Sequence, residues 1–154
     1  MPVIIRHGPK EWSNGKGPHD DPPIIEIETR KIIKKTVYKL VNKKQIPLYI
    51  VSSPYLRTLQ TSYMVQYYLC QYGMNIEVYI DNDLSEHIKG KCVRVMKENK
   101  LEYIMESETD FNSRINRVKN KDYFKKNVWI ITHRPIINKL IEGAYIETGK
   151  FIIL

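Results

Sequence analysis

Three segments of this sequence place arginine and histidine side chains directly after a run of apolar residues. In chain order they are Arg6-His7-Gly8, Ser52-Ser53-Pro54-Tyr55-Leu56-Arg57 and Thr132-His133-Arg134. Guanidinium and imidazole groups together suit a tetrahedral anion, because a guanidinium donates hydrogen bonds in a rigid fork that matches phosphate oxygens. If the fold brings the three segments to one place, they predict a phosphate-binding pocket.

The stretch before each of these segments is predicted to be a buried strand. The three stretches are Pro2–Ile5, Leu48–Val51 and Val128–Ile131, and they are rich in the β-branched and aromatic residues that favour strands. Two further strand candidates are Ile76–Ile80 and Thr148–Leu154. The sequence therefore predicts a sheet with several strands, three of which carry the candidate residues at their ends.

Helical periodicity fills the intervals between these strands. Apolar residues recur at helical spacing in residues 24–42, 56–72 and 110–120, and Pro135 opens a helix that runs to about Glu142. Residues 90–106 are ambiguous, and we expect them to be helical in part. Strands that alternate with helices predict an α/β fold, a three-layer sandwich with a mostly parallel central sheet and helices on both faces. The length of 154 residues fits a single domain over residues 1–154.

In a parallel sheet the carboxyl ends of the strands lie at one edge, which is where open α/β sheets bind ligands. The second and third segments run straight into predicted helices, whose N-termini attract anions. Each side chain taken singly has an ordinary structural explanation, such as a capped strand end, a surface arginine or a core histidine. Their joint occurrence favours one phosphate site built from Arg6, His7, Arg57 and His133.

The formal net charge is +8, and lysines supply most of the excess in two clusters, Lys31–Lys44 and Lys119–Lys126. Solvated helix faces explain such clusters best. Arginines and interleaved aromatic residues are scarce in them, which disfavours a nucleic-acid partner. Electrostatic attraction of an anionic substrate remains an alternative explanation of the charge.

The chain has no apolar run long enough to span a membrane, and Arg6 interrupts the apolar start before it could form a secretory signal. We therefore expect a cytoplasmic protein without a membrane partner. Cys70 and Cys92 are too few for a disulfide framework, and we expect packing thiols. They are also too far apart for zinc-ribbon spacing, and Asp81-Asn82-Asp83 lacks the glycine and glutamate of a calcium loop. The sequence predicts no metal site.

The candidate segments, taken in their order, resemble the histidine phosphatase superfamily, also called the phosphoglycerate mutase-like family. The matching stretches are Arg6-His7-Gly8, residues 52–61, Leu84-Ser85-Glu86 and Thr132-His133. The most specific part is the Arg-x-x-Gln-Thr pattern that follows Ser53-Pro54. The final Thr148-Gly149-Lys150-Phe151 also looks like the last strand of that family, so that the resemblance spans nearly the whole chain.

The resemblance implies a role for each matching residue. His7 would be the nucleophile that forms a phosphohistidine. The phosphoryl oxygens would be bound by Arg6, Arg57 and His133. Glu86 would protonate the leaving oxygen and then activate water, without any metal or other cofactor. Neighbouring Asp81, Asp83 or His87 could take the place of Glu86, which the motif nevertheless favours.

The chain departs from the family pattern after the second histidine, where Arg134-Pro135 stands in place of a small residue. Arg134 would contact a second phosphate or carboxylate, or else point to solvent. In the loop of residues 9–23, Asn14 is a candidate phosphate contact, although loop asparagines more often serve turns. The same loop ends in Asp20-Asp21-Pro22-Pro23, which predicts a helix start and resembles the Asp-Pro-Pro-Leu segment of the phosphotyrosine-type branch.

The reaction that the resemblance favours is phosphomonoester hydrolysis rather than mutase chemistry. A mutase must keep water away from its phosphoenzyme, and the short stretch between Arg57 and Glu86 leaves little chain for a lid. The substrate would be a small phosphorylated molecule or a phosphoprotein. Two alternatives remain open at this point: a phospholigand-binding module without turnover, and a lysine-driven nucleic-acid-binding protein. The oligomeric state does not follow from the sequence.

Overall fold

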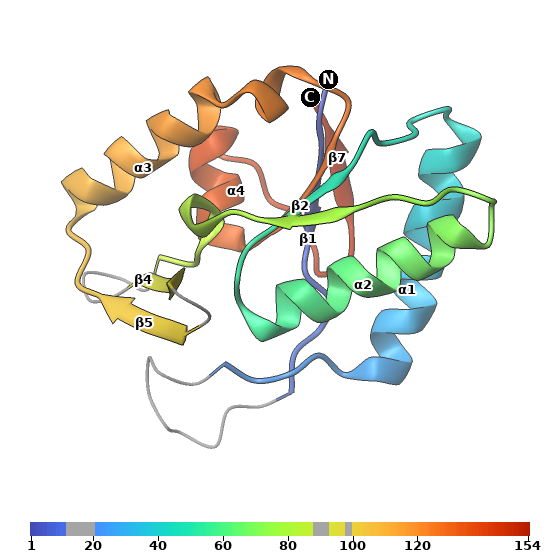
Figure 1. Ribbon diagram of the computed structural model, residues 1–154, viewed down its shortest axis with the longest axis horizontal. Helices are drawn as coiled ribbons and strands as arrows, with labels where there is room; N and C mark the ends of the chain where they lie inside the picture. Colours follow the sequence, from blue (N-terminus) through green and yellow to red (C-terminus); the bar gives the residue numbers. More distant parts are fainter. Residues whose placement is uncertain (12–20, 88–92, 98–99) are drawn as a thin grey trace.

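The computed structural model describes residues 1–11, 21–87, 93–97 and 100–154, and it is built around a five-stranded sheet (Figure 1). The strand order is β3-β2-β6-β1-β7. The strands are β1 (Val3–Arg6), β2 (Ile50–Ser52), β3 (Val78–Ile80), β6 (Trp129–Thr132) and β7 (Phe151–Ile153). Only β7 pairs antiparallel, against β1, while the other pairings of this sheet are parallel. The prediction of a mostly parallel sheet is confirmed.

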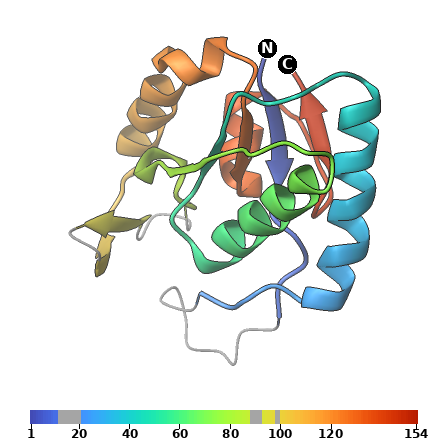
Figure 2. The ribbon, with the colours of Figure 1, turned by 45° about the vertical axis from the view of Figure 1, so that its right-hand side comes forward.

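In the described part of the chain, four α-helices cover the two faces of the sheet (Figures 1 and 2). They are α1 (Glu26–Asn42), α2 (Leu56–Cys70), α3 (Glu108–Asn120) and α4 (Arg134–Leu140). Helices α1 and α2 pack on one face, and α3 and α4 pack on the other. The three-layer sandwich predicted from the sequence is confirmed. Within the described residues, no helix combines the length and the apolar character needed to cross a membrane.

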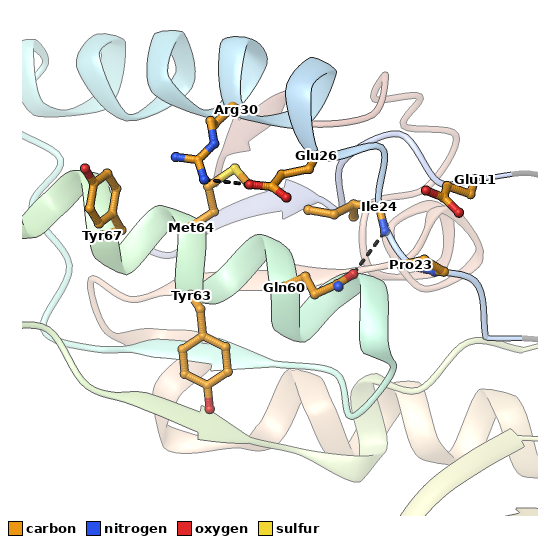
Figure 3. Close-up of a pocket in the computed structure, with 9 residues that line it drawn as sticks. All are labelled: Glu11, Pro23, Ile24, Glu26, Arg30, Gln60, Tyr63, Met64 and Tyr67. Atoms are coloured by element: carbon orange, nitrogen blue, oxygen red, sulfur yellow. Dashed lines mark hydrogen bonds and ion pairs between the residues drawn. The ribbon is translucent and has the colours of Figure 1, made fainter.

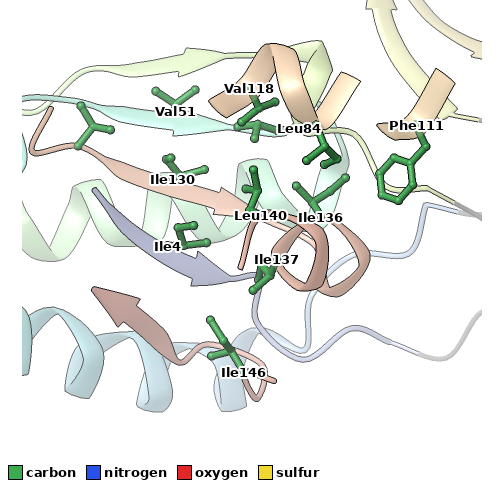
Figure 4. Packing of buried hydrophobic residues seen from close by; sticks show 12 residues of the cluster. Ile4, Val51, Leu84, Phe111, Val118, Ile130, Ile136, Ile137, Leu140 and Ile146 are labelled. Atoms are coloured by element: carbon green, nitrogen blue, oxygen red, sulfur yellow. The ribbon is translucent and has the colours of Figure 1, made fainter. Parts of the chain in front are cut away.

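The alternation of side chains along β1 produces the two cores. Val3 and Ile5 point toward α1 and α2, whereas Ile4 points to the opposite face, where it packs in the cluster with residues of α3 and α4 (Figure 4). All three are fully buried, which explains why this strand carries no polar residue before Arg6. On α1, Ile33 and Val37 are one turn apart and fill the first of these cores.

The register of the central strands aligns the ends that carry the candidate residues. Arg6 lies opposite Thr132 in the β1–β6 pairing, and Ser52 lies opposite Ile131 in the β2–β6 pairing. Because these three strands are parallel, His7, Ser53 and His133 leave the sheet at the same edge. The edge therefore collects the residues that the sequence singled out.

The prediction of partial helix in residues 90–106 is wrong. The structure has an antiparallel hairpin there, formed by β4 (Val93–Lys97) and β5 (Lys100–Ile104), and this hairpin is separate from the central sheet. Val93-Arg94-Val95 and Leu101-Glu102-Tyr103-Ile104 alternate apolar and polar residues, which is a period of two. That period is typical of a strand, and it outweighs the short apparent helical spacing.

The expected helix start at the double proline is also wrong, because α1 begins only at Glu26. The backbone before α1 lies beside residues 9–11, which follow β1. Glu11 N–H donates to the Pro23 carbonyl at 2.9 Å, and Ile25 N–H donates to the Pro9 carbonyl at 2.8 Å. These two bonds hold residues 23–25 out of the helix. The segment that precedes α1 is therefore a positioning element, and Asp21 at its start faces α2 instead.

Cys70 ends α2 as an exposed free thiol. The expectation that it packs in the core is wrong, because the buried face of α2 carries Val65 and Leu69 while Cys70 follows on the solvent side. Cys92 lies outside the described residues.

Candidate active site

At the edge formed by β1, β2 and β6, the side chains of His7, Arg57, Glu86 and His133 lie together, and we call this group the histidine pocket. The imidazole rings of His7 and His133 lie 5.3 Å apart between their centroids. Arg57 pairs with Glu86, and the Glu86 Oε1 atom lies 4.0 Å from His133 Nδ1. These contacts join four separate parts of the sequence: three of the strand-end candidates, and Glu86, which the family resemblance adds.

His7 is held in an orientation that leaves one ring nitrogen available. Its Nδ1 lies 2.7 Å from the Gly8 carbonyl oxygen, which can only accept a hydrogen bond, so that Nδ1 carries the proton. The Nε2 atom then keeps its lone pair. Burial, followed by the Arg57 charge, lowers the pKa of His7 from 6.5 to about 3. A neutral imidazole with a free Nε2 lone pair is the form that a nucleophile needs.

The backbone around His7 is fixed on three sides. His7 N–H donates to the Thr132 carbonyl at 3.1 Å, and Gly8 N–H donates to the Thr61 hydroxyl at 3.0 Å. A Cβ atom at Gly8 would lie 2.3 Å from Thr29 Cγ2, so that only glycine fits beneath α1 at this point. Gly8 thus has a packing role, because the absence of a side chain lets α1 lie close to the segment that carries His7.

His133 is completely buried, and its two ring nitrogens have different partners. Its Nε2 lies 2.8 Å from the Ser53 hydroxyl, which itself accepts from Tyr55 N–H at 3.5 Å. When Ser53 donates to Nε2, the proton of neutral His133 lies on Nδ1. That Nδ1 atom is buried and has no hydrogen-bond partner among the described residues. In this tautomer the Nδ1–H group is an unpaired buried donor, which is suited to a hydrogen bond with a phosphate oxygen.

Ser53 is a site residue that the sequence interpretation did not assign a role. The side chain lies directly after β2 and is fully buried beneath His133. The available signal was its position at a strand end, next to Pro54, which is the same signal that identified the other candidates. Burial also lowers the pKa of His133 well below its usual value.

Arg57 is 1% exposed, and two carboxylates hold its guanidinium. Asp21 Oδ1 accepts from Nη1 at 3.0 Å, while Glu86 accepts from Nη2. The second Asp21 oxygen accepts from Leu56 N–H at 2.7 Å, at the first residue of α2. Asp21 is thus a positioning residue that ties Arg57 to the start of its own helix, a function that the sequence interpretation missed when it assigned the segment to α1.

Arg6 and Arg134 meet on the other side of the pocket. Arg6 Nη1 donates to the Ile146 carbonyl at 3.0 Å, and its Nε atom is buried without a hydrogen-bond partner in the described part of the chain. Burial is the largest cause that lowers the pKa of Arg6. Arg134 is exposed, and its Cζ lies 4.9 Å from the centre of the Tyr145 ring. From the sequence, Arg134 could either contact a ligand or point to solvent. In the structure its guanidinium lies over the Tyr145 ring.

The loop that carries Glu86 is fastened from α3. The Arg114 guanidinium donates to the carbonyls of Asp83 and Ser85 at 2.6 Å and 2.7 Å, and it forms a double hydrogen bond with Glu106. Arg114 and Glu106 are both buried, which makes this anchor rigid. Glu86 itself is partly exposed and pairs with Arg57.

Asp81, Asp83 and His87, the alternatives to Glu86 as the acid, form their contacts with other residues. Asp81 accepts from Lys121 and from the Tyr123 hydroxyl, and Asp83 pairs with Arg117 and Lys121. His87 contacts Glu106 at 2.9 Å and stacks on Phe111 with a centroid distance of 4.1 Å. None of these side chains contacts Arg57 or His133 in the described structure, so the geometry favours Glu86 among the four candidates.

Two further expectations concern ligands of other kinds. Asn14 lies outside the described residues. In the described ranges, no group of three or more His, Cys, Asp or Glu side chains is arranged to hold a metal ion. The charged side chains at the site are those of arginine and glutamate, because the pKa values of His7 and His133 are lowered by burial.

A separate cavity of about 790 Å³ lies between the start of α1 and the exposed side of α2 (Figure 3). Its lining includes Ile24, Gln60, Met64 and the ion pair of Glu26 with Arg30. The Gln60 side chain accepts a hydrogen bond from Ile24 N–H at 3.0 Å, which connects α2 to the segment before α1 within the lining of the cavity. None of the predicted site residues lines it, so this cavity is distinct from the histidine pocket.

The two buried imidazoles predict a steep loss of stability in acid. Below about pH 6.5 the unfolded chain binds protons at His7 and His133, whereas folded His7 stays neutral to about pH 3. Stability is therefore present above the unfolded pKa and falls as the pH falls toward the folded pKa. For one such imidazole we expect a loss of about 2 kcal/mol between about pH 6 and pH 4.

Urea unfolding of the wild type and of His7→Gln at a series of pH values measures this loss. The variant should lose less stability over the same interval, since one of the two imidazoles is gone. Equal pH slopes for the two proteins would show that His7 titrates normally in the folded state.

Comparisons with known proteins find no matching family model and no matching curated sequence. Solved structures do match. The protein histidine phosphatase SixA complexed with tungstate superposes with a TM-score of 0.60 at 15% identity, over 98% of this chain and 92% of the other. The native mycobacterial glucosyl-3-phosphoglycerate phosphatase gives 0.57 at 19% identity, over 90% and 76%. These neighbours are members of the histidine phosphatase superfamily. The chain therefore has the fold of that superfamily, as the order of its motifs predicts.

Proposed function

We propose that this protein is a phosphatase that hydrolyses phosphomonoesters through a phosphohistidine on His7. The observation that carries the proposal is the neutral His7 imidazole, whose Nδ1 is committed to the Gly8 carbonyl and whose Nε2 is available beside Arg57 and His133. A buried nucleophile without charge, surrounded by cationic and hydrogen-donating groups, suits attack on a phosphoryl dianion.

In the first step, the Nε2 lone pair of His7 attacks phosphorus while the bond from phosphorus to the ester oxygen breaks. Glu86, in its protonated form, gives its proton to the departing oxygen, so that an alcohol leaves. Arg57 and the Nδ1–H of His133 donate to the phosphoryl oxygens, and Arg6 adds positive charge from the other side. The products of this step are the free alcohol, phosphohistidine and ionised Glu86.

In the second step, ionised Glu86 takes a proton from water, whose oxygen attacks phosphorus as the phosphorus–nitrogen bond breaks. Inorganic phosphate leaves, and His7 and Glu86 return to their starting forms. In the free protein the Glu86 carboxylate pairs with Arg57 and so stands where a phosphoryl oxygen would bind. Substrate must therefore displace this carboxylate from Arg57, which moves Glu86 toward the leaving group.

The comparisons support this reaction but leave the substrate open. The neighbours are a protein histidine phosphatase and a glucosyl-3-phosphoglycerate phosphatase, and their structures hold tungstate and inorganic phosphate, both of which are tetrahedral oxyanions. Either a small phosphorylated molecule or a phosphoprotein is a substrate of the proposed kind. The short connection between Arg57 and Glu86 favours transfer to water rather than to a second substrate.

Trapping the phosphoenzyme tests the proposal. The wild type and Glu86→Gln are mixed with p-nitrophenyl phosphate in the presence of a metal chelator and quenched in alkali, in which phosphohistidine survives. We expect a burst of nitrophenol and a phosphorylated peptide containing His7, with more accumulation in the variant because it lacks the base for the second step. Hydrolysis without any phosphorylated histidine, or with the phosphoryl group on another residue, would contradict the proposal.

A further inference from the structure

The cations around the pocket differ in how their charge is balanced. Arg57 faces two carboxylates, Asp21 and Glu86. Arg6 and Arg134, in contrast, form no ion pair with any described residue. The proposed reaction assigns Arg57 and Arg6 to the phosphoryl group. Arg134 is a further cation near them, to which that reaction gives no partner.

Arg134 is exposed, and its guanidinium contacts an aromatic ring. It follows His133 directly, and its guanidinium lies over the Tyr145 ring at 4.9 Å. The next residue, Ile146, accepts the hydrogen bond from Arg6 Nη1. Tyr145 and Ile146 thus bring the two arginines near each other, and burial, followed by the Arg134 charge, lowers the pKa of Arg6. An anion between or beside them would relieve the repulsion between the two charges.

The space in front of Arg134 is a cavity of about 600 Å³ between α3 and α4. It is lined on one side by Arg134 and Pro135, which follow the pocket residue His133, and on the other by His87, which follows Glu86. Because both walls continue directly from catalytic candidates, the cavity adjoins the pocket on the Glu86 side. That is where the leaving group must sit if Glu86 protonates it.

The cavity contains a second cation, but that cation is already paired. Lys139 Nζ lies 2.7 Å from Glu108 Oε1 and 3.1 Å from Asn112 Oδ1. The stacked rings of His87 and Phe111 supply a flat wall. Within the described lining, Arg134 is thus the one cation without a carboxylate, set beside a surface that suits a planar or aliphatic group.

We propose that Arg134 binds a second anionic group of the substrate, a carboxylate or a phosphate carried by the leaving group, and so selects phosphomonoesters that bear such a group. This inference rests on the proposed function, because it places the leaving group beside Glu86. It narrows the substrate class to phosphorylated acids, bisphosphates and phosphorylated segments with a neighbouring acidic side chain.

Matched aryl phosphates test the proposal, since they differ in charge and hardly in size. We would compare kcat/KM for 4-carboxyphenyl and 4-carbamoylphenyl phosphate, and for the corresponding meta isomers, in the wild type, Arg134→Met, Arg134→Lys and Lys139→Met. The wild type should prefer at least one carboxylate isomer over its amide. Arg134→Met should lower kcat/KM for that isomer about tenfold and leave the amide nearly unchanged, as expected for one lost charge-assisted contact. Arg134→Lys should keep part of the preference, and Lys139→Met should keep all of it.

Binding of the matching benzylphosphonates, which cannot be hydrolysed, separates the two proposals. If the wild type binds the carboxylated phosphonate more tightly and Arg134→Met does not, the second anion site stands even if no ester is hydrolysed. If the wild type hydrolyses acid and amide esters equally, and binds both phosphonates equally, the proposed function stands and the role of Arg134 is overturned. A preference that survives in Arg134→Met would assign the site to another cation.

Discussion

Replacing His7 by glutamine is expected to lower kcat/KM for phosphomonoesters by at least about 10⁴-fold, as is usual when a covalent nucleophile is removed. The glutamine side chain can keep a hydrogen bond to the Gly8 carbonyl but offers no lone pair of comparable nucleophilicity on nitrogen. The phosphoenzyme should disappear together with the activity. Steady-state kinetics and the alkaline quench on the same preparations measure both losses.

Two controls keep this result interpretable. Vanadate or phosphate should still bind to His7→Gln, because Arg57 and His133 remain, and isothermal titration measures that binding. The thermal unfolding temperature at neutral pH should change little, since the replaced imidazole is uncharged in the folded protein. If His7→Gln folds, binds phosphate and still hydrolyses esters at the wild-type rate, His7 is not the nucleophile.

Replacing Glu86 by glutamine should produce a loss that depends on the leaving group. For an alkyl phosphate, whose oxygen needs a proton to leave, kcat should fall by about 10³-fold, within the range of general acid catalysis. For p-nitrophenyl phosphate the first step needs little help, so that the remaining loss reports only the slower attack of water. A plot of kcat/KM against the pKa of the leaving alcohol should therefore be much steeper for the variant than for the wild type.

The same substitution should tighten the binding of inorganic phosphate. In the free protein Glu86 competes for Arg57 and brings negative charge into the pocket, whereas an amide does not. Asp83→Asn is the matched control, because Asp83 is a neighbouring carboxylate that pairs with Arg117 and Lys121 instead. A leaving-group-dependent loss in Asp83→Asn, with none in Glu86→Gln, would transfer the acid role to Asp83.

The strand ends were the part of the site that the sequence predicted best. Apolar runs with β-branched residues define strands 1, 2 and 6 within a residue or two, and parallel pairing then brings His7 and His133 to one edge without further information. Arg57 follows from the same argument, because it lies one residue into the helix after β2. Local pattern and sheet geometry suffice for these three residues.

Residues whose positions depend on distant contacts were not predictable in the same way. The position of Glu86 depends on Arg114, which lies on α3 and donates to two backbone carbonyls of the loop before Glu86. The role of Asp21 depends on its reaching α2, thirty-five residues further along the chain. Its acidic, proline-marked surroundings favour a helix start on propensity alone, and a tertiary ion pair overrides that preference.

The position of β1 has a consequence for how the molecule is made. Both strands that flank it, β6 and β7, come from the last part of the sequence, between Trp129 and Ile153. The strand that ends beside His7 is therefore synthesised before both of its neighbours, and its contacts have the largest sequence separation in the sheet. During synthesis, the apolar Val3–Ile5 stretch has no strand partners until residues 129–153 have left the ribosome. The contact between His7 and His133 should therefore form late, so that a nascent chain that ends before β6 carries the His7 imidazole without its folded surroundings.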